Sequence, residues 1–204
     1  MTDPSTPPPI VLASQSPRRA ELIARLGLQF DVQPADIDES YRSGETPPAH
    51  AERLAREKAE AIARTHPHAL VVGSDTIVVT DGDVLGKPKH REQAVEMLMR
   101  LSGRDHEVCT GVAVAMDGRV ESGLERVRVR FRALDRRACE EYVATGEPMD
   151  KAGAYGIQGY GATIVARVDG DYFAVMGLPV QRLIRVLREL GIRYAFGPLD
   201  AAPA

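Results

Sequence analysis

The chain alternates between short runs of hydrophobic residues and stretches in which hydrophobic residues recur every three or four positions. Such a pattern indicates strands that alternate with helices. The run ALVVGSDTIVV at 69–79 is rich in β-branched residues and predicts a long strand. An Asp117-Gly118 turn joins two further strands as a hairpin, and an Asp169-Gly170 turn leads into 171–175. The other predicted strands lie at 10–13, 28–33, 84–85, 106–116, 119–133 and 162–168.

Two helix starts are marked by a hydroxyl residue followed by proline, Ser16-Pro17 and Thr46-Pro47. The hydroxyl side chain suits the N-cap, and proline suits the first helical position. Because hairpins interrupt the alternation of strands and helices, we expect an α/β fold with a mixed sheet and flanking helices. Helices are predicted at 17–26, 47–65, 90–101, 135–145 and 179–190.

The length fits one domain, or two small lobes that share a cleft. The chain has 204 residues, of which 44% are hydrophobic, enough to bury a core. We expect a single catalytic domain over 10–191, a disordered proline-rich tail at 1–9 and a C-terminal tail at 192–204.

Charge and cysteine usage exclude several protein classes. Lys and Arg number 26 and Asp and Glu 29, so neither sign dominates, and we expect no nucleic-acid or membrane partner. The N-terminus lacks the charged and apolar regions of a secretory signal. Cys109 and Cys139 lie far apart and form no CxxC, which favours inert thiols and a cytoplasmic location.

The segment Ser14-Gln15-Ser16-Pro17-Arg18-Arg19 places two arginines in the first turn of a predicted helix. Cations are unfavourable there because the helix N-terminus is itself partly positive. A bound phosphate would compensate, since backbone N–H groups, guanidinium groups and serine hydroxyls all favour it. The alternative is that both arginines point into solvent or meet carboxylates.

Lys58 falls on the apolar stripe of the helix predicted at 47–65. An inward lysine costs free energy unless it is paired, so it either extends to solvent or points into a cleft lined with anions. On this reasoning, Lys58→Ala is expected to leave the fold intact or slightly more stable.

Asp75 interrupts the apolar run at 69–79 and needs a metal, a cation or several hydrogen-bond donors. Gly73 and Ser74 just before it indicate that something approaches the backbone closely. A purely structural buried aspartate is the alternative.

A glycine-rich stretch at 153–161 follows Asp150-Lys151, and Lys87 follows the turn at 81–82. The stretch is not a dinucleotide fingerprint, because its order is G-x-x-G-x-G and a strand follows it. The segment 82–87 is not a P-loop, because it is one residue short and proline follows the lysine. Glycines nevertheless let a backbone pass close to a ligand.

Several basic side chains in unusual positions, together with the carboxylates of Asp75 and Glu39, indicate a site for a polyphosphate that carries Mg²⁺ or Mn²⁺. This reasoning indicates phosphate chemistry and does not say which bond breaks. The cations are Arg18, Arg19, Lys58, Lys87 and Lys151.

A series of motifs resembles, in order and from about residue 10 to 191, those of the Maf family. They are LASQSPRRAELI (12–23), DES (38–40), LAREKA (54–59), GSDTIVV (73–79), LGKP (85–88), LSG (101–103), TGVAV (110–114), DKAGAYGIQGYGA (150–162) and GLP (177–179). The resemblance implies an ITPase-like fold of two lobes around a central cleft, often a homodimer. It also implies metal-dependent hydrolysis of nucleoside triphosphates between the α and β phosphates.

The resemblance also implies roles for individual residues. Asp75 is the expected proton acceptor, and Glu39 is expected to bind metal or orient water. Ser14, Arg18, Arg19, Lys58 and Lys87 are expected to hold the triphosphate. The family positions that tune substrate choice correspond to Arg18, Thr76 and Gln158. The stretch DKAGAYGIQG resembles the branch that acts on dTTP and UTP.

Three alternatives stay open from the sequence. The first is the same chemistry on 7-methyl-GTP or inosine triphosphate. The second is a nucleotide-binding regulator of septum formation and cell division, which need not turn over. The third is a structural interaction protein.

Overall fold

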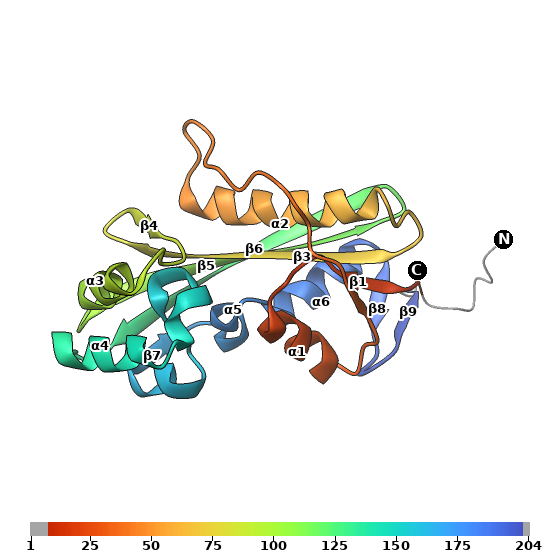
Figure 1. Ribbon diagram of the computed structural model, residues 1–204. Helices are drawn as coiled ribbons and strands as arrows, with labels where there is room; N and C mark the ends of the chain where they lie inside the picture. The colour runs from red at the N-terminus through yellow and green to blue at the C-terminus, as the bar shows by residue number, and fades with distance from the viewer. Residues whose placement is uncertain (1–7, 202–204) are drawn as a thin grey trace. The chain divides into compact units, whose positions relative to one another are not determined.

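The computed structural model describes residues 8–201, and its elements alternate as the hydrophobic pattern predicts (Figure 1). Three short 3-10 helices, η1 to η3, follow α4. In chain order the elements are β1 (Ile10–Leu12), α1 (Pro17–Arg25), β2 (Asp31–Val32), α2 (Pro47–Ala63), β3 (Leu70–Thr80), β4 (Asp83–Leu85), α3 (Arg91–Leu101), β5 (Asp105–Met116), β6 (Arg119–Phe131), α4 (Arg136–Ala144), η1 (Glu147–Asp150), η2 (Ala152–Ala154), η3 (Gly159–Thr163), β7 (Val165–Asp169), α5 (Tyr172–Met176), α6 (Val180–Glu189), β8 (Ile192–Tyr194) and β9 (Leu199–Ala201).

Seven strands form one sheet in the order β2-β1-β3-β5-β6-β7, with β4 paired to β3. β1 is parallel to both β2 and β3, whereas β4 is antiparallel to β3 and β7 is antiparallel to β6. The prediction of an α/β fold with a mixed sheet and flanking helices is therefore confirmed.

The chain divides into two compact units. Unit 1 comprises residues up to Asp75, Thr110–Glu125, and residues from Gly177 onward, and unit 2 comprises Thr76–Cys109 and Arg126–Met176. The central cleft expected between two lobes stays a prediction. The expected tail at 1–9 lies mostly outside the described residues, and the expected tail at 192–204 contains the β8–β9 pair.

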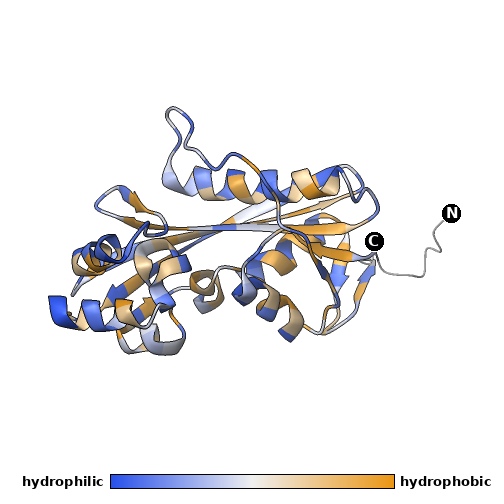
Figure 2. Ribbon diagram, viewed as in Figure 1, coloured by the Kyte–Doolittle hydropathy of each residue, from blue (hydrophilic) through white to orange (hydrophobic). Residues whose placement is uncertain are grey.

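In unit 1, α2 covers one face of the sheet and α1 and α6 lie on the other (Figure 1). Hydrophilic and hydrophobic residues form bands along α2, as expected for a helix with one buried side (Figure 2). Its buried alanines pack with small side chains of β3 and β5. Small residues on both sides let the helix lie close to the sheet.

In unit 2, α3 and α4 lie side by side, and a separate core joins them to the sheet (Figure 1). Phe131 and Tyr155 are among its largest buried side chains, with their rings 4.7 Å apart in an edge-to-face arrangement. Cys109 and Cys139 are buried free thiols, as expected, and burial raises the pKa of both.

Two predicted segments differ from the structure. The Asp169-Gly170 turn leads into the short helix α5 and not into a second strand, because the Asp171 carboxylate accepts a hydrogen bond from Phe173 N (2.8 Å) and starts a helical turn. β7 begins at Val165 and not at 162, because residues 159–163 form a 3-10 helix.

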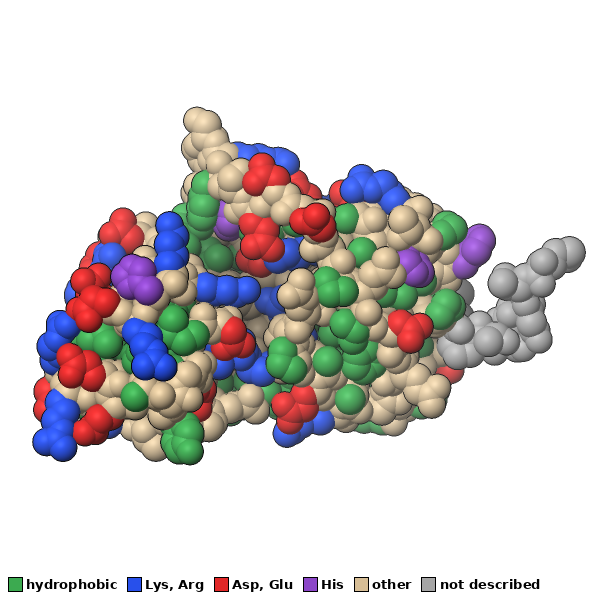
Figure 3. All heavy atoms as spheres, in the orientation of Figure 1, with side chains coloured by type: hydrophobic (Ala, Val, Ile, Leu, Met, Phe, Trp, Pro, Cys, Tyr) green, Lys and Arg blue, Asp and Glu red, His purple; other side chains and the backbone are tan. Residues whose placement is uncertain are grey.

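Among residues 8–201, no helix combines the length and the hydrophobicity needed to cross a bilayer. On the face in Figure 3, acidic and basic side chains are intermixed. Neither observation tests the expected absence of nucleic-acid and membrane partners, which stays a prediction.

Candidate functional site

The N-terminus of α1 is built around Arg19. Its Nη1 donates to Ser14 Oγ (2.9 Å) and its Nε to the Gly177 carbonyl (2.8 Å), so it does not point freely into solvent. Ser14 Oγ also accepts from Ser16 N (3.2 Å), which folds the loop after β1 back on itself. Burial lowers the pKa of Arg19; Asp75 and Glu39 oppose this effect, and Arg18 adds to it.

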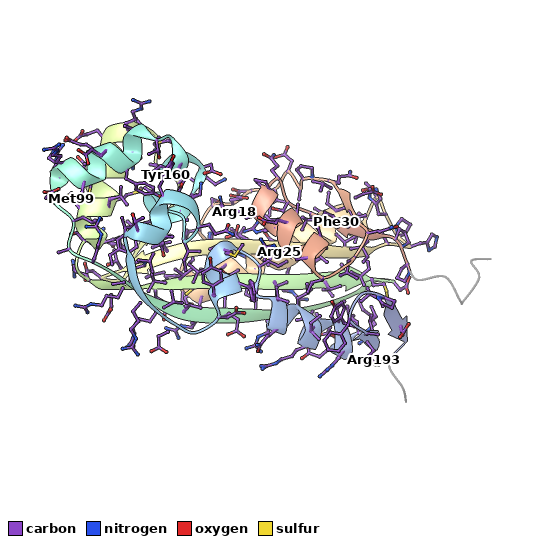
Figure 4. The ribbon with its side chains drawn as sticks, turned by 90° about the horizontal axis from the view of Figure 1, so that it is seen from below. Arg18, Arg25, Phe30, Met99, Tyr160 and Arg193 are labelled. Carbon is purple, nitrogen blue, oxygen red and sulfur yellow. The ribbon has the colours of Figure 1, made fainter. Side chains whose placement is uncertain are left out.

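Arg18 is half-buried in the same first helical turn (Figure 4). That turn contains no acidic residue, and the Ser16 side chain makes no cap hydrogen bond. Two guanidinium groups therefore lie at an already positive helix end. Such a place favours a phosphate.

The contact between α2 and β3 explains Gly73. A Cβ at Gly73 would lie 2.2 Å from the Ala55 carbonyl oxygen and 2.8 Å from Ala59 N, distances that no real side chain tolerates. The helix backbone thus lies directly on the strand, and a second contact of this kind occurs between Gly111 and Ala51. The prediction that something approaches Gly73 closely is confirmed, and that neighbour is α2.

Two residues further along β3, Asp75 faces the same helix. Lys58 Nζ lies 2.7 Å from Asp75 Oδ1 and 2.6 Å from Glu39 Oε1. Lys58 and Asp75 are both 8% exposed. Lys58 therefore does not extend to solvent, as one alternative proposed, but joins two carboxylates that are distant in sequence.

The loop that carries Glu39 is held by Arg53 of α2. Arg53 donates to the Ser40 carbonyl (3.0 Å) and makes two hydrogen bonds to the Glu45 carboxylate (2.6 and 2.8 Å). The hydrogen bond from Arg53 is the main cause that lowers the pKa of Glu45. The sequence alone does not indicate this pair, because Arg53 lies on the face of the helix opposite the apolar stripe, where charged side chains are common.

Ser74 links the two halves of this cluster. Its buried hydroxyl lies 2.7 Å from the Gly111 carbonyl and 2.9 Å from the Gly177 carbonyl. Because Gly177 also accepts from Arg19, one carbonyl ties the start of α1 to the strand that carries Asp75. The motif GLP at 177–179 was the sequence signal for this position, but nothing in it indicated a role.

The remaining predicted residues belong to unit 2. Lys151 Nζ donates to the Glu147 carbonyl and to Asp150 Oδ1 (2.6 Å). Gly153 N donates to the Gly86 carbonyl (3.1 Å), which brings the glycine-rich stretch against the loop of the exposed Lys87. Thr76, on β3, and Gln158 are half-buried.

The structure thus brings five predicted residues into one network in unit 1: Ser14, Arg19, Glu39, Lys58 and Asp75. Among the described residues, no group of three or more His, Cys, Asp or Glu side chains could hold a metal ion. Asp75 and Glu39 nevertheless present hard oxygen ligands on either side of one ammonium group. Mg²⁺ commonly takes one or two carboxylates together with substrate phosphates, so this pair fits a metal that arrives with a triphosphate.

Comparisons with known proteins cover nearly the whole chain. A family model described as "Maf-like protein" matches residues 9–190. A dTTP/UTP pyrophosphatase of Moorella thermoacetica is 53% identical over 90% of this chain and 95% of its own length. One from Bacillus pumilus is 46% identical over 90% and 97%. The Staphylococcus aureus Ham1 protein structure covers 76% of this chain and 79% of its own, with 18% identity and a TM-score of 0.46.

Proposed function

The chain belongs to the Maf family, and from that membership we propose that it hydrolyses dTTP and UTP to the nucleoside monophosphate and pyrophosphate. It is in this sense a nucleoside triphosphate pyrophosphatase. Relatives of 44 to 53% identity that carry the name dTTP/UTP pyrophosphatase support the substrate. The observation in the structure that carries the proposal is the buried Lys58–Asp75 pair, with Glu39 beside it and the cationic start of α1 linked to it.

The start of α1 binds phosphate. Arg19 is already fixed by Ser14 and Gly177, so little side-chain entropy is lost when a phosphate oxygen approaches its guanidinium group. Arg18 and the free backbone N–H groups of the first turn add to the attraction. In unit 2, Lys87 and Lys151 are further phosphate ligands in this proposal, on the basis of their charge and of the family resemblance.

Asp75 is the general base. Lys58 holds its Oδ1, which leaves Oδ2 to accept a proton from the water that attacks the α-phosphorus. The bond between the α-phosphorus and the bridging oxygen breaks, and pyrophosphate leaves. The arginines and lysines stabilise the charge that develops on it. No residue of the chain becomes phosphorylated.

Asp75 and Glu39 are the residues that would hold a divalent metal, Mg²⁺ or Mn²⁺. When bound, such an ion supplies a positive charge that polarises phosphate oxygens and acidifies a water molecule. The hard oxygen ligands of the two carboxylates support this assignment.

Hydrolysis in H₂¹⁸O tests the reaction. The purified protein is incubated with UTP, dTTP, CTP, 7-methyl-GTP and inosine triphosphate, each with Mg²⁺, Mn²⁺ or EDTA. Attack at the α-phosphorus places ¹⁸O in the monophosphate and leaves pyrophosphate unlabelled. We expect this result with UTP and dTTP and no turnover in EDTA. Nucleoside diphosphate with orthophosphate would refute the proposed bond, and Asp75→Asn serves as the inactive control.

The same panel decides between the alternatives. A preference for 7-methyl-GTP or inosine triphosphate would move the protein to another substrate. Binding without turnover would favour a nucleotide-binding regulator of septation. A homodimer and a cytoplasmic location are carried forward as proposals, to be checked by light scattering of the purified protein and by imaging of a fluorescent fusion.

A further inference from the structure

The glycine-rich stretch of unit 2 is wrapped around one carboxylate. A Cβ at Gly159 would lie 2.5 Å from Glu147 Oε2, and one at Gly156 would lie 3.1 Å from Lys151 Cε and 3.3 Å from Glu147 Oε1. A Cβ at Gly161 would lie 1.9 Å from the Gly156 carbonyl oxygen and 2.6 Å from the Tyr142 hydroxyl. Contacts within the protein therefore explain these three glycines, and Glu147 and Tyr142 are among the groups that crowd them.

Three donors converge on the two oxygens of Glu147. Oε1 accepts from the Tyr142 hydroxyl (2.8 Å) and from Gly161 N (3.0 Å), and Oε2 accepts from Tyr160 N (2.9 Å). The Tyr142 hydroxyl in turn accepts from Gly156 N (3.1 Å). The carboxylate accepts at both oxygens, whereas the NH₂ group of glutamine only donates, so glutamine cannot make all of these hydrogen bonds.

Glu147 also holds the beginning of the stretch, because its backbone carbonyl accepts from Lys151 Nζ. The backbone carbonyl of Glu147 thus contacts the first residue of the segment 151–161, and its side chain contacts the end of the segment. The segment contains Lys151 and Gln158. The carboxylate is well held: burial acts to raise the pKa of Glu147, but the hydrogen bonds from Tyr142 and the two amides outweigh it, and the pKa lies below its ordinary value.

We propose that Glu147 is a positioning residue, which fixes the shape of the segment 151–161 so that Lys151 and Gln158 meet the nucleotide. Tyr142 connects Glu147 to Gly156, because its hydroxyl donates to the Glu147 carboxylate and accepts from Gly156 N. The inference rests on the proposed function, since it assigns Lys151 and Gln158 to the substrate. Glu147 itself touches no reacting atom.

The test compares Glu147→Gln with Glu141→Gln. Glu141 lies on α4 with its side chain 65% exposed and paired with Arg137 of the same helix, so it serves as a matched control. In Glu147→Gln an amide NH₂ faces backbone N–H donors. We expect KM for UTP to rise about tenfold, kcat to fall less than threefold because Asp75 and Lys58 are untouched, and the preference for UTP over CTP to fall severalfold. Glu141→Gln should match the wild type.

Hydrogen exchange and ligand binding separate this inference from the proposed function. The amides of Tyr160 and Gly161 should exchange faster in Glu147→Gln, and a non-hydrolysable UTP analogue should bind about tenfold more weakly. Where Glu147→Gln does not fold, Tyr142→Phe removes one donor and should give a smaller change of the same kind. Faster exchange with unchanged KM, analogue affinity and preference would overturn the inference. A wild type that binds the analogue but hydrolyses no triphosphate would refute the proposed function alone.

Discussion

Lys58 Nζ donates to Asp75 Oδ1 at 2.7 Å, and about nine-tenths of each side chain is shielded from solvent. The two residues meet because α2 lies directly on β3 at Gly73. From the sequence, an inward Lys58 costs stability, and Lys58→Ala should leave the fold intact or slightly more stable. The contacts in the structure lead to the opposite expectation, because removing the lysine leaves Asp75 buried and opposite Glu39.

We therefore predict that Lys58→Met and Asp75→Asn each destabilise the protein. Loss of one partner from a buried ion pair costs about 3 kcal/mol. Urea unfolding measures this loss, and UTP hydrolysis should fall about a hundredfold or more in Asp75→Asn, since the general base is gone.

The double variant Lys58→Met/Asp75→Asn separates stability from chemistry. It leaves no unpaired charge of the pair, so its loss of stability should be smaller than the sum of the two single losses. Its activity should stay as low as that of Asp75→Asn. Strictly additive losses would show that the two side chains do not stabilise each other.

Arg19→Lys tests whether the shape of the guanidinium group matters beyond its charge. Lysine keeps the charge but cannot reach Ser14 and Gly177 together with the planar group of arginine. We expect kcat/KM for UTP to fall about tenfold or more, a loss that corresponds to about 1.4 kcal/mol. Arg25→Lys is the control, because Arg25 lies at the other end of α1 in an exposed pair with Glu21 (Figure 4). Equal kinetics in both variants would refute the role of Arg19.

Gly73→Ala should damage both fold and site. Its methyl group would meet the backbone of α2, which cannot move aside as a flexible side chain does, so the helix must shift. Overpacking of this kind costs about 1–3 kcal/mol, and the shift carries Lys58 away from Asp75. Thermal unfolding and UTP hydrolysis should both decline. Gly86→Ala controls for stability, because nothing lies within 4 Å of its added Cβ.

Gln158→Ala tests whether the Gln158 amide recognises the pyrimidine base of the nucleotide. An amide offers both a donor and an acceptor, which suits the O2/O4 and N3–H edge shared by uracil and thymine, whereas cytosine presents the opposite pattern at N3 and position 4. The wild type should prefer UTP and dTTP over CTP, and the variant should lose most of that preference, since a lost hydrogen bond in a buried site costs about 1–3 kcal/mol. The Gln158 side chain makes no cap hydrogen bond to η3. If the variant keeps the wild-type order of preference among UTP, dTTP and CTP in a competition assay, Gln158 has only a structural role.

His106 predicts acid sensitivity of unit 2. Burial lowers its pKa from 6.5 to about 4, and its Nδ1 has no hydrogen-bond partner among residues 8–201. The unfolded chain therefore takes up a proton first as the pH falls. The free energy of unfolding should therefore be highest above pH 6.5 and should fall by about 3 kcal/mol in total as the pH is lowered to about 4.

The variant His106→Phe keeps the aromatic contacts with Phe131 and Tyr155 and lacks the titrating group. Its stability should start lower, because Tyr155 loses its hydrogen-bond partner, but should change less between pH 6.5 and 4. Urea unfolding across this range measures both slopes. His68→Asn, at an exposed position, should retain the slope of the wild type.

Local patterns predict the elements because each depends on neighbours in the chain. The Thr46-Pro47 start of α2 is an example: the threonine hydroxyl accepts from Ala49 N, as a cap should. The prediction failed at 171–175, where one aspartate side chain was enough to start a helix in place of a strand. Turn chemistry of this kind competes with a weak strand pattern.

The mixed α/β fold, the family and most residues of the candidate site can be predicted from the sequence, because they follow from periodicity, turn residues and motifs in a fixed order. The partner of each polar side chain, by contrast, becomes known only from the three-dimensional fold. Lys58 and Asp75 are 17 positions apart and Arg19 and Gly177 are 158 apart. No local pattern encodes such pairs; they form because burial of the α2–β3 contact excludes water and leaves each polar group only the partners that the fold brings within reach.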